Sequence, residues 1–217
     1  MRMNTIKKAA EEDRNAILKL YRTRLYGPAD WNEYYPNEET IEFDLSRDAL
    51  FVMKNDAGEL IATISIDEDQ EVDSLTVWDE NIAPAGELAR LCVREDMQNQ
   101  GIAKEMMRYA FDALKEQGKK GVHILVRKGH AGAIACYTAL GFQQVGECSL
   151  FEKEFICMEQ SVSADLSSAS FHQQESSWTR WESSTETEIK WRLMYKIHKD
   201  ILMPDYIQPH IIQRKIL

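Results

Sequence analysis

The chain has 217 residues, which is enough for one domain of ordinary size with an extension. Its formal net charge is −10, with 36 acidic and 26 basic residues. This balance argues against a nucleic-acid binder, because phosphate backbones are bound mainly by clustered lysines and arginines. An acidic surface suits a cationic or amine partner, and it also serves simply to keep a protein soluble.

The cysteines and the N-terminus exclude further classes. The four cysteines form no C-x-x-C pair and have no histidine at zinc spacing, so we expect reduced thiols and no metal site. The first residues, MRMNTIKKAAEED, contain no apolar segment of the signal-peptide type, and no apolar run approaches membrane-spanning length. The sequence therefore predicts a cytoplasmic protein with no membrane partner.

The N-terminal part predicts three strands and two helices. The expected ranges are strand 5–9, helix 11–25, helix 37–45, strand 50–54 and strand 59–67. An aromatic loop, ADWNEYYP at 29–36, separates the helices, and the turn Asn55 to Gly58 joins the last two strands as a hairpin. We expect the acidic segment 67–73 to be solvated and 75–78 to be a strand fragment.

The central part predicts alternating strands and helices. The expected ranges are strand 87–93, polar loop 94–100, helix 101–117, strand 121–126, helix 131–140, and strands 143–148 and 151–158. Gly118 is the expected end of the first of these helices. A strand-to-helix junction presents unpaired backbone N–H groups and the positive end of the helix dipole, so the loop before Gly101 can bind an anion.

Two motifs in this part resemble the GNAT N-acetyltransferase family. Gln98-Asn99-Gln100-Gly101-Ile102-Ala103 fits the pattern Gln/Arg-x-x-Gly-x-Gly/Ala of the loop that binds the acyl-CoA pyrophosphate in that family. The stretch from Ala133 to Tyr137, closed by Leu140-Gly141-Phe142, fits the last helix of its core. The resemblance covers residues 4–160 and implies the GNAT acyl-CoA N-acyltransferase fold, an α/β (α+β) fold with a mixed central sheet flanked by helices.

The resemblance also implies which residues bind acetyl-CoA. Backbone N–H groups around Leu91, Cys92 and Val93 would hold the pantetheine and polarise the thioester carbonyl. The pyrophosphate would lie against Gln98, Asn99, Gln100, Gly101, Ile102, Ala103 and Lys104. His130 and Ala133 complete the set; His130 stands where many members carry asparagine, and its alternative role is to cap the helix.

Two residues match the catalytic positions of the family. Tyr137 falls on the tyrosine that is the usual general acid, and Glu87 on the general-base glutamate of histone-type members. Tyr137 is alternatively a core aromatic; Glu87 is alternatively an ion-pair partner, with water deprotonating the amine. Strand alternation predicts that Glu87 shares a face with Leu91 and Val93. An acyl-cysteine route is disfavoured, because no histidine is spaced as a base.

The implied function is direct transfer of an acetyl group from acetyl-CoA to an amine, without a metal. A small-molecule amine is preferred to a protein or peptide amine. Trp31, Tyr34 and Tyr35 lie where the family shapes its acceptor pocket, and they either line a substrate site or close the core. The alternative function is a non-catalytic CoA-binding regulatory module with a partner-binding tail; the retention of Tyr137 and Glu87 favours the enzyme.

The composition changes after residue 160. All ten glycines and all four cysteines precede this point, and nine serines lie within 161–187, which predicts a linker. Residues 188–217 are expected to form a helical extension, with an apolar stripe from Ile189 to Ile201 that ends before Pro204. The stripe is expected to pack on its own domain or to form a homodimer, and a separate binding function is the alternative.

Overall fold

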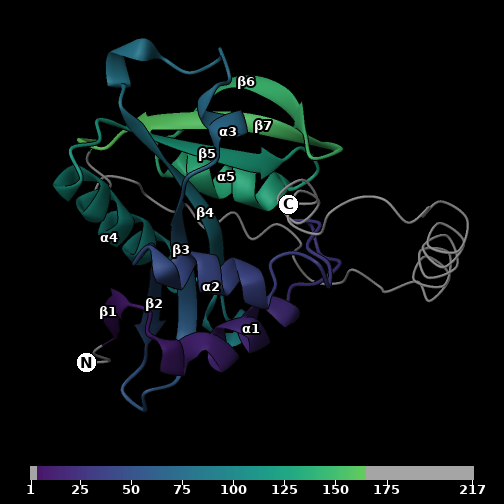
Figure 1. Cartoon of the computed structure of the whole chain (residues 1–217), viewed down its shortest axis with the longest axis vertical. Helices are drawn as coiled ribbons and strands as arrows, with labels where there is room; N and C mark the ends of the chain where they lie inside the picture. Colours follow the sequence, from purple (N-terminus) through teal and green to yellow (C-terminus); the bar gives the residue numbers. More distant parts are fainter. Residues whose placement is uncertain (1–3, 165–217) are drawn as a thin grey trace, which may run out of the picture. The chain divides into compact units, whose positions relative to one another are not determined.

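The computed structural model describes residues 4–164, so the predicted linker and C-terminal helix lie outside the described residues. The strands are β1 (Thr5–Lys8), β2 (Leu50–Lys54), β3 (Leu60–Asp67), β4 (Ala85–Val93), β5 (Gly121–Arg127), β6 (Gln143–Leu150) and β7 (Lys153–Ser161). The helices are α1 (Arg14–Arg22), α2 (Glu38–Ser46), α3 (Gln70–Asp73), α4 (Ile102–Glu116) and α5 (Ala131–Ala139), with 3-10 turns at Glu11–Asp13, Glu80–Ile82 and Glu95–Met97. The predicted mixed sheet flanked by helices is confirmed (Figure 1).

The seven strands form one sheet in the order β1-β2-β3-β4-β5-β7-β6. Every neighbouring pair is antiparallel except β4 and β5, which are parallel. These two strands pair only where Ala85, Gly86 and Glu87 meet Gly121, Val122 and His123. Beyond this point β4 continues along β3 and β5 continues along β7. The sheet therefore opens between the C-terminal parts of its two central strands.

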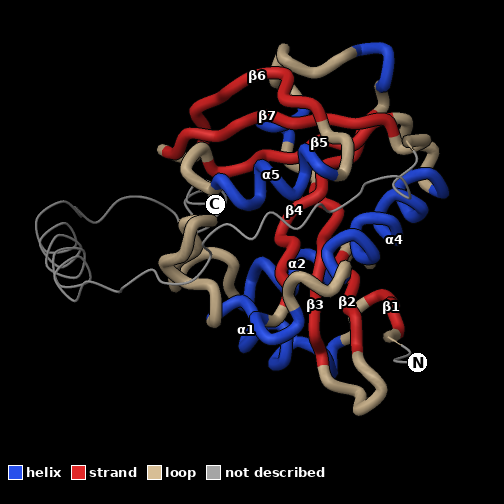
Figure 2. Tube along the Cα trace, turned by 180° about the vertical axis from the view of Figure 1, so that it is seen from behind, coloured by secondary structure: helices blue, strands red, loops and turns tan. Residues whose placement is uncertain are grey.

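Helices cover both faces of the sheet. Helices α4 and α5 lie on the face seen in Figure 2, while α1 and α2 lie on the face seen in Figure 1. In α4, apolar residues at every fourth position, from Ile102 through Met106 and Ala110 to Leu114, are buried against strands β3, β4 and β5. On the other face, Tyr21 of α1 and Ile41 of α2 pack with a smaller cluster. None of the helices within residues 4–164 is long and apolar enough to cross a membrane.

A bulge in β4 alters the predicted alternation of side chains. Thr63 faces Cys92 and Ser65 faces Ala89, so the single residue between them on β3 lies opposite two residues of β4, Arg90 and Leu91. Leu91 and Val93 pack with the apolar cluster on the α4 face of the sheet. Cys92 packs with the smaller cluster on the α1 and α2 face. The expectation that Glu87 shares a face with Leu91 and Val93 is therefore wrong, because the extra residue moves them to the opposite face.

Other differences from prediction concern segment ends. Residues 75–78 form no strand, and the acidic segment before them contains α3, in which Asp69 Oδ1 accepts the N–H groups of Glu71 at 2.8 Å and Val72 at 3.4 Å. The helix predicted at 11–25 is a 3-10 turn followed by α1. Packing extends two residues beyond the predicted domain end, since Val162 is buried and its N–H donates to the Lys120 carbonyl at 2.9 Å.

Candidate active site

The junction between β4 and α4 has the backbone of an anion site. Gly101 precedes α4 with a φ of +81°, and a Cβ added to it would meet nothing within 4 Å. The Glu105 N–H makes the first backbone bond of the helix, to the Gly101 carbonyl at 3.1 Å, so the N–H groups of Ile102 and Ala103 precede the helical ladder. An open backbone at the positive end of a helix fits a pyrophosphate.

The side chains of this loop brace the loop itself. Gln98 Nε2 donates to the Val93 carbonyl at 3.3 Å, and Gln100 Nε2 donates to the Asp96 carbonyl at 3.1 Å. Arg94 lies at the surface, where its guanidinium pairs with Asp96 at 2.7 Å and Glu59 at 3.3 Å. The feature of the loop that suits an anion is therefore its backbone.

His130 caps α5. Its Nδ1 accepts the Ala133 N–H at 3.3 Å, and burial lowers the pKa of the imidazole. A nitrogen can accept a hydrogen bond only while it is unprotonated, so the lowered pKa preserves the cap. The structure thus confirms the capping alternative, which fixes the start of the helix that carries Tyr137.

Tyr137 is partly buried, and its ring packs beside Phe142 with the ring centroids 5.8 Å apart. No hydrogen-bond partner for its hydroxyl is found among the described residues. Burial, with a contribution from Cys136, raises the pKa of this phenol, so the hydroxyl keeps its proton at neutral pH. The packing of the ring suits a core aromatic, and the protonated hydroxyl suits a proton donor.

Glu87 lies in β4 beside the end of the β4–β5 pairing and is 8% exposed. Its Oε2 has no hydrogen-bond partner within the described part of the chain. Burial raises the pKa of Glu87 well above its usual value, and the neighbouring Asp67 raises it further, whereas Arg90 acts in the opposite direction. A carboxylate that holds protons this readily has the character of a general base.

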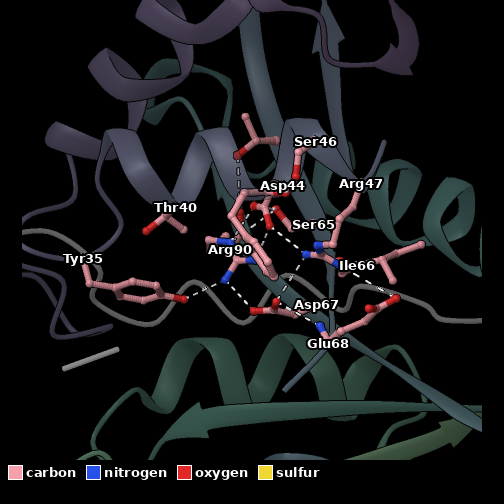
Figure 3. Close-up of polar contacts among 12 residues, drawn as sticks. Tyr35, Thr40, Asp44, Ser46, Arg47, Ser65, Ile66, Asp67, Glu68 and Arg90 are labelled. Carbon is pink, nitrogen blue, oxygen red and sulfur yellow. Dashed lines mark hydrogen bonds and ion pairs between the residues drawn. The ribbon is translucent and has the colours of Figure 1, made fainter. Parts of the chain in front are cut away.

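A buried arginine, Arg90, joins residues of α2, β3 and the aromatic loop in one charged network (Figure 3). Arg90 holds Asp44 through Nη2 at 2.8 Å and Nε at 3.0 Å, and Asp67 through Nη1 at 2.6 Å. Burial opposes the charge on Arg90, but Tyr35, Asp44 and Asp67 outweigh that effect and raise its pKa. Burial likewise disfavours ionised Asp67, yet Arg90 lowers its pKa overall. Asp67 is therefore held ionised in direct register with Glu87.

The sequence did not predict this network. The available signal was an arginine inside an otherwise apolar strand, since a buried cation requires acidic partners. Those partners come from α2 and the end of β3, 46 and 23 residues before Arg90. Spacing along the chain does not predict that these segments meet.

The three aromatic residues of the 29–36 loop have different surroundings. Trp31 packs edge-on against the buried Tyr21, with ring centroids 5.3 Å apart, so it closes the core. The Tyr35 hydroxyl accepts a hydrogen bond from Arg90 Nη1 at 3.0 Å, and Tyr34 is 43% exposed. Tyr35 is thus brought to the charged network of Arg90.

Cys92 and Cys157 are buried, and Cys136 and Cys148 are half-buried. Burial raises the pKa of Cys92 to about 11 and also raises that of Cys136. Because the thiolate is the nucleophile, these shifts disfavour an acyl-cysteine route, as the sequence predicts. Within residues 4–164, no group of three or more His, Cys, Asp or Glu side chains is arranged to hold a metal ion.

Solved structures of acetyltransferases share this fold. The chain is similar to the ribosomal-protein-S18-alanine N-acetyltransferase of Escherichia coli, with 20% identity, a TM-score of 0.57, and coverage of 75% of this chain and 96% of that one. It is also similar to yncA of Salmonella typhimurium, solved with its cofactor acetyl-CoA, with 16% identity, a TM-score of 0.59, and coverage of 75% and 96%. The phosphinothricin acetyltransferase of Sinorhizobium meliloti, in complex with acetyl-CoA, gives 18% identity, a TM-score of 0.59, and coverage of 73% and 88%.

A search of curated protein sequences found no significant match. The sequence does match the acetyltransferase (GNAT) family over residues 14–142, a range that runs from the start of α1 to the end of the α5 motif. This range includes the loop at Gly101, Glu87 and Tyr137. The chain therefore belongs to the GNAT acetyltransferase family.

Proposed function

We propose that this protein is an acetyl-CoA-dependent N-acetyltransferase that moves the acetyl group directly to an amine. The observation that carries the proposal is the pair formed by Asp67 and Glu87. The first carboxyl has a lowered pKa and the second a raised one, although they face each other across two strands. Environments that separate the pKa values of neighbouring acids are typical of acid–base catalysis.

Each residue has a defined task in this proposal. Acetyl-CoA supplies an acetyl group activated as a thioester. Glu87 accepts a proton from the amine, and Tyr137 gives a proton to the departing sulfur. The backbone from Gly101 to Ala103 binds the pyrophosphate. The part of β4 around Leu91, Cys92 and Val93, which pairs with β3 but not with β5, holds the pantetheine. His130 and Ala133 fix the start of the helix on which Tyr137 lies.

The acceptor that we propose is a small-molecule amine in preference to a protein or peptide amine. The net charge of −10 supports an acceptor that arrives as a cation, because an acidic protein attracts cations. The names of the similar structures suggest two first acceptors: a peptide with an N-terminal alanine, and phosphinothricin. Phenethylamine and spermidine would represent simple and multiply charged small amines.

A thiol-release assay tests the proposal. The protein is mixed with acetyl-CoA and each of these four acceptors, and free thiol is followed between pH 6 and pH 9. We expect thiol release with at least one small amine, and a Glu87→Gln variant that loses most of the rate near neutral pH and partly recovers it at high pH. Tight binding of CoA without amine-dependent thiol release would instead support the regulatory module.

A further inference from the structure

A row of four titratable side chains crosses four adjacent strands. Asp67 on β3 faces Glu87 on β4, Glu87 faces His123 on β5, and His123 faces Glu159 on β7. Cross-strand partners point to the same face of a sheet, so these side chains are consecutive neighbours on one face. The last three are buried, with exposures of 8%, 6% and 7%. A buried line of ionisable groups thus leads from Glu87 across the sheet.

Several polar atoms in this row have no partner. Glu87 Oε2 and both ring nitrogens of His123 are buried without a hydrogen bond in the described residues. Such atoms are rare in folded proteins, because each one carries an uncompensated desolvation cost. His123 Nε2 lies 3.8 Å from Glu159 Oε2, a separation that a small side-chain shift would close. The unpaired atoms cost free energy of folding in this arrangement, which points to a role for them other than stability.

The far end of the row reaches the protein surface. Glu159 Oε2 accepts the Asp79 N–H at 3.0 Å, and Asp79 is itself exposed. The surface segment that contains Asp79 also contributes Trp78, whose ring stacks on the His123 imidazole with centroids 3.9 Å apart and planes 13° apart. Stacking covers one ring face and leaves both nitrogens at the ring edge. The imidazole is therefore held in place with its nitrogens available to neighbours in the row.

His123 is neutral at neutral pH. Burial lowers its pKa to about 4, and the nearby Lys119 contributes to the decrease. A neutral imidazole has one N–H donor and one free nitrogen, so it can accept a proton on one side while giving one up on the other.

We propose that His123 acts on the reaction through Glu87. It carries protons from Glu87 to Glu159 and so to the surface. This proposal rests on the proposed function, in which Glu87 takes a proton from the amine. Glu87 then gives that proton to the free nitrogen of His123, while the N–H on the other nitrogen passes its proton to Glu159. One proton enters and one leaves, the imidazole ends as its other tautomer, and Glu159 releases its proton to water. Exchange of the ring proton with water then restores the first tautomer, with the free nitrogen again toward Glu87. Glu87 is thereby returned to the carboxylate form for the next turnover.

The surrounding charges act on each member of the row. Those that face Glu87 are Asp67 on β3, Asp69 and Asp73 at α3, and Arg90 on β4. The three acids favour protonated Glu87 and Arg90 opposes them, so Glu87 accepts a proton readily. Cys148 on β6 also senses the charge of Glu87. Lys119 disfavours an imidazolium at His123, so a proton that arrives there is passed on.

The first test uses the protein without ligands. The ring of His123 is labelled with ¹⁵N, the Glu87 carboxyl with ¹³C, and both chemical shifts are followed from pH 4 to pH 9. We expect the ring shifts to change at the pH where Glu87 titrates, and this change to vanish in Glu87→Gln. Ring shifts that ignore the titration of Glu87 would overturn the relay. A Glu87 that titrates at its ordinary value would instead remove the base from the proposed function, which separates the two failures.

The second test uses two variants of His123. His123→Phe keeps the stacking on Trp78 but has no nitrogen, and His123→Gln keeps a donor and an acceptor but cannot transfer a proton between them. We expect both variants to lower kcat/KM by about tenfold or more near pH 7. The loss should shrink at high pH, where more amine arrives deprotonated, and the affinity for acetyl-CoA should stay unchanged.

The comparison of variants distinguishes the relay from a structural role. If His123 serves only to stack, His123→Phe should behave like the parent at every pH, and this result would overturn the proposal. Should one variant fail to fold, as judged by thermal unfolding, the other provides the same comparison. The relay would be rejected, and the proposed function kept, by one pair of results. In that pair the pH profile of the His123 variant parallels the parent, while Glu87→Gln loses rate near neutral pH and recovers part of it at high pH.

Discussion

Asp67 and Glu87 face each other across β3 and β4, and the structure moves their pKa values in opposite directions. Burial is the largest cause of the raised pKa of Glu87. Burial also opposes ionisation of Asp67, but Arg90 binds Asp67 directly at 2.6 Å and lowers its pKa overall. Asp67 is thus held as an anion, and burial together with this neighbouring charge raises the pKa of Glu87, so Glu87 takes up a proton more readily than Asp67. Burial at Glu87 and the arginine at Asp67 therefore give different roles to two residues of similar chemistry.

Replacing Asp67 tests this assignment. Asp67→Asn removes the anion that raises the pKa of Glu87, while Arg90, which lowers that pKa, remains. The pKa of Glu87 should therefore fall. We expect the acidic limb of the kcat/KM profile to move to lower pH. Glu68→Gln is the matched control, because Glu68 is exposed and pairs only at 3.8 Å with Arg47. An unchanged acidic limb in Asp67→Asn would show that Asp67 does not act on the base.

Glu87→Gln should also affect stability in a pH-dependent way. The folded-state pKa of Glu87 is raised above its unfolded value, so folding favours the protonated form. The contribution of this group is therefore complete below the unfolded pKa of about 4.5 and decreases as pH rises toward the folded pKa. We expect the variant to gain stability over the parent with rising pH, by about 1.4 kcal/mol for each unit by which the pKa is raised. Urea unfolding at several pH values, with Glu116→Gln at the surface as control, measures this.

Arg90→Met should strongly destabilise the protein. Asp44 is fully buried, and the substitution leaves it without its main cation. Loss of one partner from a buried ion pair costs about 3–5 kcal/mol. Arg94→Met is the control, since its pairs with Asp96 and Glu59 lie at the surface and contribute about 0–1 kcal/mol. Denaturant unfolding that gives similar values for both variants would contradict the network described here.

Gly101 offers a test of the anion site with a matched control elsewhere in the chain. Gly101 and Gly58 both have a positive φ, +81° and +76°, and an added Cβ would meet nothing within 4 Å at either position. Gly101→Ala and Gly58→Ala should therefore cost the same backbone strain, about 1–2 kcal/mol. Only Gly101→Ala and, more strongly, Gly101→Glu should weaken CoA binding in calorimetry. Unchanged affinity in a folded Gly101→Glu variant would remove the pyrophosphate assignment.

Tyr137→Phe should lower the rate with little effect on CoA affinity. The substitution keeps the ring beside Phe142 and removes only the hydroxyl. A positioned general acid contributes about a hundred- to ten-thousand-fold, so kcat should fall within that range. The hydroxyl has no hydrogen-bond partner among the described residues, so unfolding should be almost unaffected. Equal rates for parent and variant across the pH range would leave Tyr137 as a core aromatic.

The sequence predicted the elements whose signals are local. The spacing of Ile102, Met106 and Ala110 gave α4, and the turn at Asn55 to Gly58 gave the hairpin of β2 and β3. It did not predict the bulge at Arg90, because an extra residue in a strand leaves the pattern of apolar residues nearly unchanged. The row from Asp67 to Glu159 was missed for a related reason, since its members meet only through strand register, which depends on the whole sheet.

The short junction between β4 and β5 also bears on how the sequence can vary. His123 is kept beside Glu87 by three residue pairs, whereas seven pairs join β5 to β7. A residue inserted between Gly118 and Gly121 would therefore slip the weaker junction and leave β5, β6 and β7 aligned with one another. His123 would keep its place beside Glu159 and lose its place beside Glu87. The link from Glu87 to the surface therefore depends on the shortest strand pairing in the described sheet.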